Sequence, residues 1–185
     1  MVAEAPFEQT EAGLVPAGKG WFVLNAREAR WRHREGRGKS LPFTGTTHEE
    51  LVAYFPQVGV NLHRLDPGGQ MSMYHWEDDQ EDFLVLDGEA LLIVEGQERP
   101  LERWDFVHCP AGTSHTIIGA GDLPCLVLAV GSRVKVGTPE WGAYTVDETA
   151  IRLGAGVEEE TTDAEVAYAR YPEPESTRYR AGWLP

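Results

Sequence analysis

One short stretch of the chain holds the residues whose types and spacing could support chemistry. His75 is followed by Glu77 two positions later and by Glu81 four positions after that. Side chains two residues apart in an extended strand leave the same face, about 6 to 7 Å apart along the backbone. Imidazole and carboxylate groups together suit a borderline or hard divalent metal ion. The stretch therefore predicts a metal site on a β-hairpin, to which His115 would add a second imidazole.

The spacing of these residues resembles the first conserved motif of the cupin family, G-x5-H-x-H-x3-E-x6-G. Four of the five motif positions match, at Gly69, His75, Glu81 and Gly88. Glu77 stands where the motif has its second histidine.

The second cupin motif, G-x5-P-x-G-x2-H-x3-N, is matched at its centre. Pro110, Gly112 and His115 fall on its spacing, whereas Trp104 and Gly119 replace its first and last residues. The resemblance covers roughly residues 58 to 131 and is to a small, single-domain cupin. It implies an all-β fold, an antiparallel double-stranded β-helix or jelly-roll barrel.

The resemblance also implies a metal shell made of His75, Glu77, Glu81 and His115. The common cupin shell of three histidines and one glutamate leaves a divalent ion with net positive charge, whereas this shell would be formally neutral. The extra carboxylate favours harder ions such as manganese or ferrous iron, and zinc remains compatible. In the alternative interpretation, Glu77 faces solvent and water completes the shell.

Three further residues are candidates for the surroundings of the metal. Gln80, next to Glu81, could orient a ligand or a water molecule, or it could be a solvated turn residue. His108 would face the barrel in one strand parity and be a structural histidine in the other. His63, on a strand of alternating character, is a candidate cavity group.

Composition limits the partners of the 185-residue chain. Thirty acidic against sixteen basic residues give a net charge of −14, which disfavours nucleic acid and anionic membranes as partners. The first residues lack the basic-then-apolar pattern of a signal peptide, so we expect a cytoplasmic protein. Cys109 and Cys125 form no C-x-x-C pair and are predicted to be buried free thiols, with a bridge between them as the alternative.

The order of apolar runs and turns predicts one domain with three parts. Residues 1–57 form an N-terminal arm with flanking strands, residues 58–131 the core barrel, and residues 132–185 an extension that packs on it. Short strands bounded by Gly, Pro and Asp are typical of a sandwich or barrel. They are expected at residues 21–24, 60–65, 70–76, 83–86, 90–94, 106–109, 115–118 and 126–130. Short helices are expected at residues 25–31, 147–153 and 162–170.

Six of the sixteen positive charges lie between Arg27 and Lys39. This segment could be a solvated loop, or a face that pairs with acidic residues of another subunit. The more specific interpretation is that it captures an anionic group of a ligand.

Three functions fit these observations. The first is a metal-binding cupin that holds a divalent ion and a small polar ligand in its barrel. The second is a mononuclear metal enzyme, a dioxygenase or isomerase acting on a small carboxylate or phenol. The third is a non-catalytic structural or assembly cupin. The resemblance further implies a homodimer.

Overall fold

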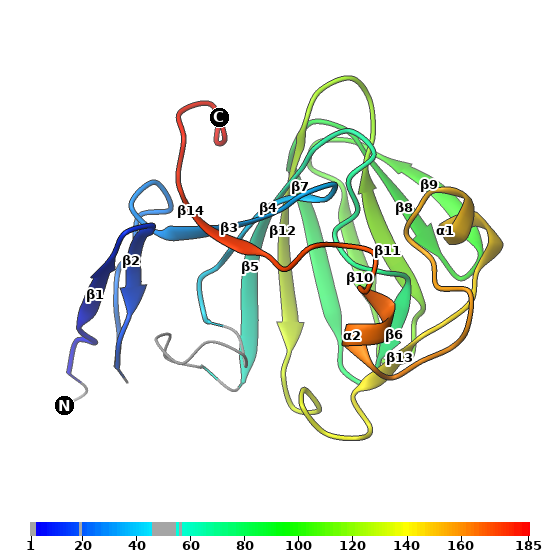
Figure 1. The fold of residues 1–185 in the computed structure, drawn as a ribbon, viewed down its shortest axis with the longest axis horizontal. Helices are drawn as coiled ribbons and strands as arrows, with labels where there is room; N and C mark the ends of the chain where they lie inside the picture. Colours follow the sequence, from blue (N-terminus) through cyan, green and yellow to red (C-terminus); the bar gives the residue numbers. More distant parts are fainter. Residues whose placement is uncertain (1–2, 19, 46–54, 56) are drawn as a thin grey trace.

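The computed structural model describes residues 3–18, 20–45, 55 and 57–185, and most of its regular structure is β-strand (Figure 1). The first strands are β1 (Phe7–Thr10), β2 (Gly13–Pro16), β3 (Arg30–Arg34), β4 (Gly38–Pro42), β5 (Val58–Leu65), β6 (His75–Glu77) and β7 (Glu81–Asp87). They are followed by β8 (Ala90–Val94), β9 (Gln97–Leu101), β10 (Phe106–Cys109), β11 (His115–Gly119), β12 (Cys125–Ser132), β13 (Gly142–Tyr144) and β14 (Glu175–Arg178). The helices are α1 (Glu148–Arg152) and α2 (Ala164–Ala167).

Two antiparallel sheets form the barrel. One has the strand order β10-β7-β12-β5-β4-β3-β14, and the other has the order β13-β6-β11-β8-β9. Both sheets contribute to one apolar cluster, in which Phe83, Val85, Ile117 and Val127 are almost completely buried. The predicted antiparallel jelly-roll barrel is confirmed.

Turn chemistry explains why several strands end where the sequence predicts. The hairpin between β8 and β9 turns at Glu95 and Gly96, both with positive φ (48° and 71°), as a two-residue type I′ turn requires. Strands β8 and β10 have the predicted bounds. The predicted strand at residues 70–76 forms only at its end, as β6, because residues 70–74 make irregular contacts with other segments.

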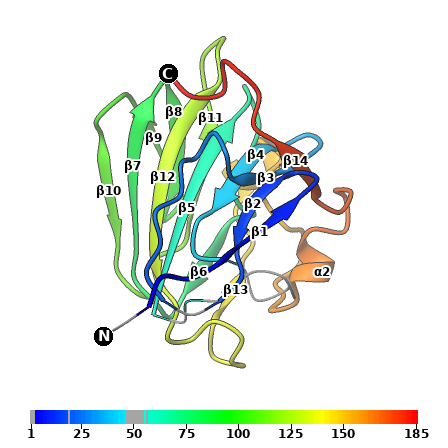
Figure 2. The ribbon, with the colours of Figure 1, turned by 90° about the vertical axis from the view of Figure 1, so that its left-hand side faces the viewer.

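The N-terminal third differs from its prediction. The expected strand at residues 21–24 and the expected helix at residues 25–31 are both wrong: Trp21 forms an isolated bridge, and a turn leads directly into β3. Strands β3 and β4, which hold most of the basic segment, extend the seven-stranded sheet past the barrel, and β14 pairs with β3 at its edge (Figure 2). The basic segment is therefore largely strand rather than loop.

A second apolar cluster covers the outer face of this sheet extension. Trp31, which is 0% exposed, packs there against Leu41 and Leu62. The C-terminal Trp183 contacts the Trp31 ring at 5.4 Å between centroids, and Trp31 Nε1 donates a hydrogen bond of 2.8 Å to the Ala26 carbonyl. Segments from both ends of the chain thus close the outer face of one sheet.

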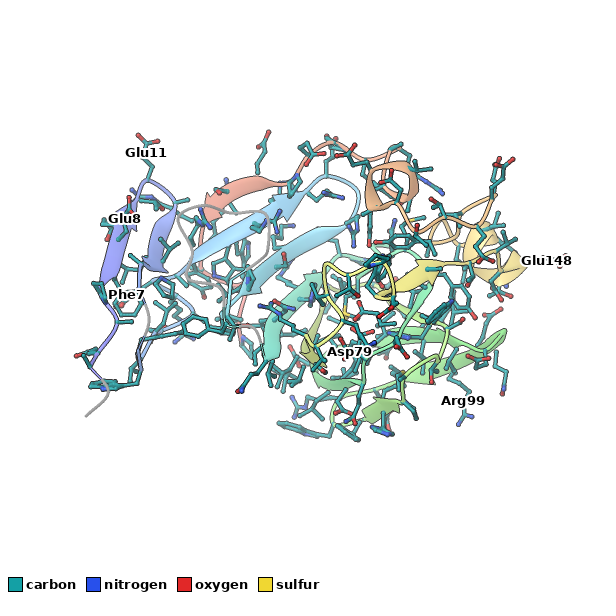
Figure 3. The ribbon with its side chains drawn as sticks, turned by 90° about the horizontal axis from the view of Figure 1, so that it is seen from below. Phe7, Glu8, Glu11, Asp79, Arg99 and Glu148 are labelled. Atoms are coloured by element: carbon teal, nitrogen blue, oxygen red, sulfur yellow. The ribbon has the colours of Figure 1, made fainter. Side chains whose placement is uncertain are left out.

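The remaining elements decorate the barrel. Figure 3 shows the β1–β2 hairpin, which carries Phe7, Glu8 and Glu11, at the opposite end of the molecule from Glu148 of α1. Helix α1 forms within the predicted range, whereas α2 is shorter than the predicted helix at residues 162–170. Cys109 and Cys125 are buried free thiols, as predicted. Among the described residues, no helix has the length and apolar character to cross a membrane.

Replacing Trp31 by alanine tests the second cluster. We expect Trp31→Ala to lower the free energy of unfolding by about 3–5 kcal/mol, because a fully buried indole leaves a large cavity. Trp104, which is 65% exposed, is the matched control, and Trp104→Ala should change stability by only about 0.5 kcal/mol or less. Urea denaturation measures both values, and similar losses in the two variants would contradict the packing described here.

Candidate metal centre

Strand pairing brings the two histidines together. His75 is the first residue of β6 and His115 the first residue of β11, and the two are directly opposite each other in this antiparallel pair. Opposite residues in a ladder project from the same face. The two imidazole rings lie 5.2 Å apart between centroids, and both are buried.

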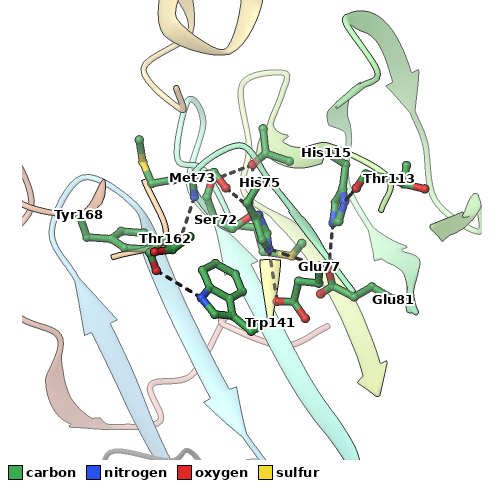
Figure 4. A network of polar contacts seen from close by, with 12 residues as sticks. Ser72, Met73, His75, Glu77, Glu81, Thr113, His115, Trp141, Thr162 and Tyr168 are labelled. Atoms are coloured by element: carbon green, nitrogen blue, oxygen red, sulfur yellow. Dashed lines mark hydrogen bonds and ion pairs between the residues drawn. The ribbon is translucent and has the colours of Figure 1, made fainter. Parts of the chain in front are cut away.

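Backbone carbonyls fix the orientation of both rings (Figure 4). His75 Nδ1 is 2.8 Å from the Met73 oxygen, and His115 Nδ1 is 2.9 Å from the Thr113 oxygen. A carbonyl can only accept a hydrogen bond, so each Nδ1 carries the proton when the ring is neutral. Nε2 of each ring then presents a lone pair, which is the arrangement of metal-binding histidines.

Glu81 approaches the histidines from the other sheet, as the first residue of β7. Its Oε2 lies 3.3 Å from His115 Nε2 and 3.9 Å from His75 Nε2, and the ligand atoms of these three residues all lie within 4.8 Å of one another. Two donors about 2.1 Å from one ion, at angles between tetrahedral and octahedral, are roughly 3.0–3.4 Å apart. The Glu81–His115 pair is already within this range, and small changes of side-chain torsion would bring His75 Nε2, 3.9 Å from Glu81 Oε2, to the same divalent ion.

The polar atoms of this group lack other partners. Glu81 Oε2 and His115 Nε2 are buried, and apart from their mutual contact at 3.3 Å neither has a hydrogen-bond partner within the described part of the chain. Burial alone would lower the pKa of His115, but polar contacts with Cys109 and Glu81 outweigh it and raise that pKa to about 10. Burial opposes ionisation of Glu81 as well, yet His115 and His75 hold its pKa below the usual range. The site is built to keep an anionic carboxylate next to imidazole nitrogens.

Glu77 is near this group but outside the closest set. Its Oε1 lies 3.4 Å from His75 Nε2, on the same face of β6, and its side chain is 20% exposed. The group of ligand atoms within 4.8 Å of one another comprises His75, Glu81 and His115. The role of Glu77 as a ligand stays a prediction.

Gln80 and His108 are not brought to the three ligands. His108 Nδ1 and Gln80 Nε2 each lie 2.7 Å from an oxygen of Asp82. His108 faces outward because Cys109, its neighbour on β10, points into the apolar core. In the described structure both side chains contact the partly exposed carboxylate of Asp82.

Aromatic rings surround the two histidines, and two of these rings, Tyr144 and Trp141, lie outside both motifs. Tyr144 and Trp141 lie 5.7 Å and 6.3 Å from its ring, while Phe83 lies 5.2 Å from the ring of His115. Tyr144 arrives because β13 pairs with β6, and burial raises the pKa of its hydroxyl. Nothing in the local sequence around residue 144 signals this pairing.

Tyr168, just after α2, connects the C-terminal extension to the site. The Met73 N–H donates to the Tyr168 hydroxyl at 3.1 Å, and the carbonyl of the same Met73 accepts from His75. The backbone of one residue thus links the extension to the orientation of a candidate ligand. Sequence analysis missed Tyr168, which lies far from both motifs.

A cavity of about 860 Å³ adjoins the barrel interior, and His63 is part of its lining. Burial lowers the pKa of His63 to about 4, and the positive charge of Arg37 acts in the same direction. His63 is therefore neutral at neutral pH. The prediction that His63 is a cavity group agrees with this position.

Comparisons with known proteins agree with the fold. The model of the family described as "Cupin domain" matches residues 61–131. An RmlC-like cupin from Shewanella frigidimarina NCIMB 400 superposes with a TM-score of 0.51 at 13% identity, over 63% of this chain and 95% of that protein. A sugar phosphate isomerase from a cupin superfamily, from Silicibacter pomeroyi DSS-3, is 30% identical over 58% of this chain and 62% of that one, with a TM-score of 0.43.

Among curated proteins, the mannose-1-phosphate guanylyltransferase of Klebsiella pneumoniae is 26% identical over 104 residues. The aligned segment covers 56% of this chain but only 20% of that protein. The chain thus matches about a fifth of the length of this relative.

The partly buried position of His63 in the cavity wall gives a prediction for its titration. In metal-free protein, the ring signals of His63 in NMR spectra should titrate with a midpoint near pH 4. Over about pH 5.5 to 8 the ring should stay neutral, because burial disfavours the charged form. The spectrum of His63→Gln assigns the signal. A midpoint near the ordinary histidine value of about 6.5 would show that the ring is not enclosed as described.

Proposed function

Residues 61–131 form a cupin domain, and from this premise we propose that the protein binds one divalent metal ion through His75, Glu81 and His115. The ion would be manganese, iron or zinc. A small polar ligand would occupy the adjoining cavity.

The observation that carries this proposal is a pair of buried polar atoms that, within the described residues, have no hydrogen-bond partner apart from each other. Buried polar atoms in folded proteins are nearly always satisfied, and leaving one unpaired costs about 1–3 kcal/mol, with more for charged groups. Here Glu81 Oε2 and His115 Nε2 lie 3.3 Å apart, and among the described residues neither atom has a further hydrogen-bond partner. A cation between them would satisfy both atoms at once.

The donor set supports a borderline or hard ion. Two imidazoles and one carboxylate are common ligands of zinc, iron and manganese, and they leave further coordination positions open. When bound, the ion would supply Lewis acidity toward an oxygen of a ligand. Phe83, Tyr144 and Trp141 surround the histidines with apolar surface, which excludes water and strengthens electrostatic contacts there.

Glu77 is the proposed fourth ligand. Its carboxylate already faces His75 Nε2 at 3.4 Å, so a change of side-chain torsion would bring it to the same ion. Its charge would make the metal site formally neutral and would favour manganese or ferrous iron over an ion that prefers nitrogen ligands.

Removal of single ligands tests the metal site. Wild-type protein loaded with Mn²⁺ or Zn²⁺ should retain about one ion per chain, measured by elemental analysis after dialysis. His75→Ala and Glu81→Gln should each weaken metal binding by at least about 100-fold, since even changes outside the ligand set cost roughly 10- to 100-fold. His108→Asn, at an exposed position on the outer face, is the control and should bind like wild type. Retention of one ion by Glu81→Gln would refute the assignment.

Substitution of Glu77 separates its role from that of Glu81. We expect Glu77→Gln to keep one ion per chain but to weaken Mn²⁺ affinity by about tenfold, because a neutral amide oxygen is a poorer ligand for a hard ion. Titration calorimetry measures the change, with Zn²⁺ as the comparison ion. An affinity equal to that of wild type would show that Glu77 does not reach the metal.

A further inference from the structure

The 860 Å³ cavity concentrates positive charge in a strongly acidic protein. Four cationic side chains, Arg32, Arg34, Arg37 and Lys39, line it together with two acidic ones, Glu165 and Glu173. This local excess of two positive charges contrasts with the net charge of −14 for the whole chain. A cavity lined by an excess of one sign of charge focuses the field and attracts ligands of the opposite sign.

Strand geometry puts two of these arginines on the inner face of the sheet. Arg32 is opposite Ser40 in the β3–β4 pair, and Ser40 is opposite His63 in the β4–β5 pair. Residues in register share a face, and side chains alternate along a strand, so Arg34 lies on this face too. Trp31, the residue before Arg32, points to the opposite face of the sheet, where it packs in the outer apolar cluster.

Arg37 is held in place by the backbone of the segment that leads to His75. Its Nε donates to the Gln70 carbonyl at 3.1 Å, and its Nη2 donates to the Met71 carbonyl. Its guanidinium also lies 4.7 Å from the centre of the Tyr168 ring. Arg37 is thus a fixed positive charge in the cavity wall.

The charge of Arg34 is only weakly compensated. Its Nη2 is 4.0 Å from a carboxylate oxygen of Glu173, whose side chain is 99% exposed, and such surface pairs contribute little. The Arg34 side chain itself is only 18% exposed. Burial and the nearby Arg37 charge both lower the pKa of Arg34, as expected where positive charges are crowded.

We infer that this cavity binds the carboxylate or phosphate group of a small organic anion, with Arg32 and Arg34 as its recognition residues and Arg37 as a fixed charge behind them. The planar guanidinium fork matches both oxyanions with paired hydrogen bonds. Tyr168 and Tyr171 provide an aromatic wall for the rest of the molecule.

The cavity also adjoins the barrel core that surrounds the candidate metal ligands. Leu65 and Met71 belong both to its lining and to the barrel core cluster, in which Phe83 contacts the ring of His115. His63 interacts electrostatically with both Arg37 and Glu81. The inference rests on the proposed metal-binding function in one respect: the end of the ligand opposite its anionic group would face the metal.

Anion titration of the metal-free protein tests this site. Chelator-treated protein is titrated with inorganic phosphate, and separately with succinate, at constant ionic strength in a calorimeter. Arg34→Gln and Arg32→Gln should each weaken binding of the recognised anion by about tenfold or more, as loss of a charge-assisted hydrogen bond predicts. Arg99→Gln removes one positive charge from the exposed strand β9, which lies away from β3 and β4 in Figure 3, and should leave binding unchanged.

Each outcome decides the inference. If the Arg32 and Arg34 variants bind phosphate more weakly than wild type, the cavity is a phosphate site. If only their succinate binding is weaker, it is a carboxylate site. Equal affinities in wild type and Arg34→Gln, or no binding of either anion up to about 50 mM, overturn the inference. Chelator treatment keeps the result independent of the metal proposal, which Glu81→Gln tests separately.

A measurement on the wild-type chain guards against misfolding of the variants. NMR signals of the arginine side-chain N–H groups are followed during the same titrations. The signals of Arg32 and Arg34 should shift with the recognised anion while that of Arg99 does not. A uniform shift of all three would show nonspecific screening and would overturn the inference.

Discussion

The hydrogen bond from each histidine Nδ1 to a backbone carbonyl is the constraint on which the candidate site depends. These bonds commit Nε2 of His75 and of His115 to the small space in front of Glu81. The carbonyls belong to Met73 and Thr113, each two residues before the histidine it orients. The turns that precede β6 and β11 therefore set the chemistry of the strands that follow them.

Side chains that alternate between the two faces of the seven-stranded sheet separate apolar packing from the lining of the cavity. On β3, Trp31 faces the outer apolar cluster, whereas Arg32 and Arg34 face the cavity. Apolar packing on the outer face holds β3 in position, and this in turn fixes where the charged side chains on its inner face lie. The C-terminal extension takes part on both faces, through Trp183 outside and Tyr168 inside.

Sequence reasoning recovered what local patterns encode. Two short motifs that resemble those of cupins identified His75, Glu81 and His115 as candidate ligands, and turn residues located the central strands, because each of these signals lies within one short segment. It failed where distant pairing decides the structure. The residues before β3 carried helix signals but form a turn, and the basic segment extends a sheet because β14, more than 100 residues later in the chain, pairs with it. Tyr144 reaches the site through the pairing of β13 with β6, and Tyr168 through its hydrogen bond with Met73; no local pattern reports either contact.

The backbone of Met73 is shared between the extension and a candidate ligand, since its N–H binds Tyr168 and its carbonyl orients His75. The segment that resembles other cupins, residues 61–131, is therefore smaller than the unit that shapes the centre. Trimming this chain to residues 61–131, or moving that segment into another scaffold, would remove the Tyr168 hydroxyl that holds the backbone of Met73, whose carbonyl orients His75. A segment meant to keep the geometry of the site must therefore extend to the turn after α2.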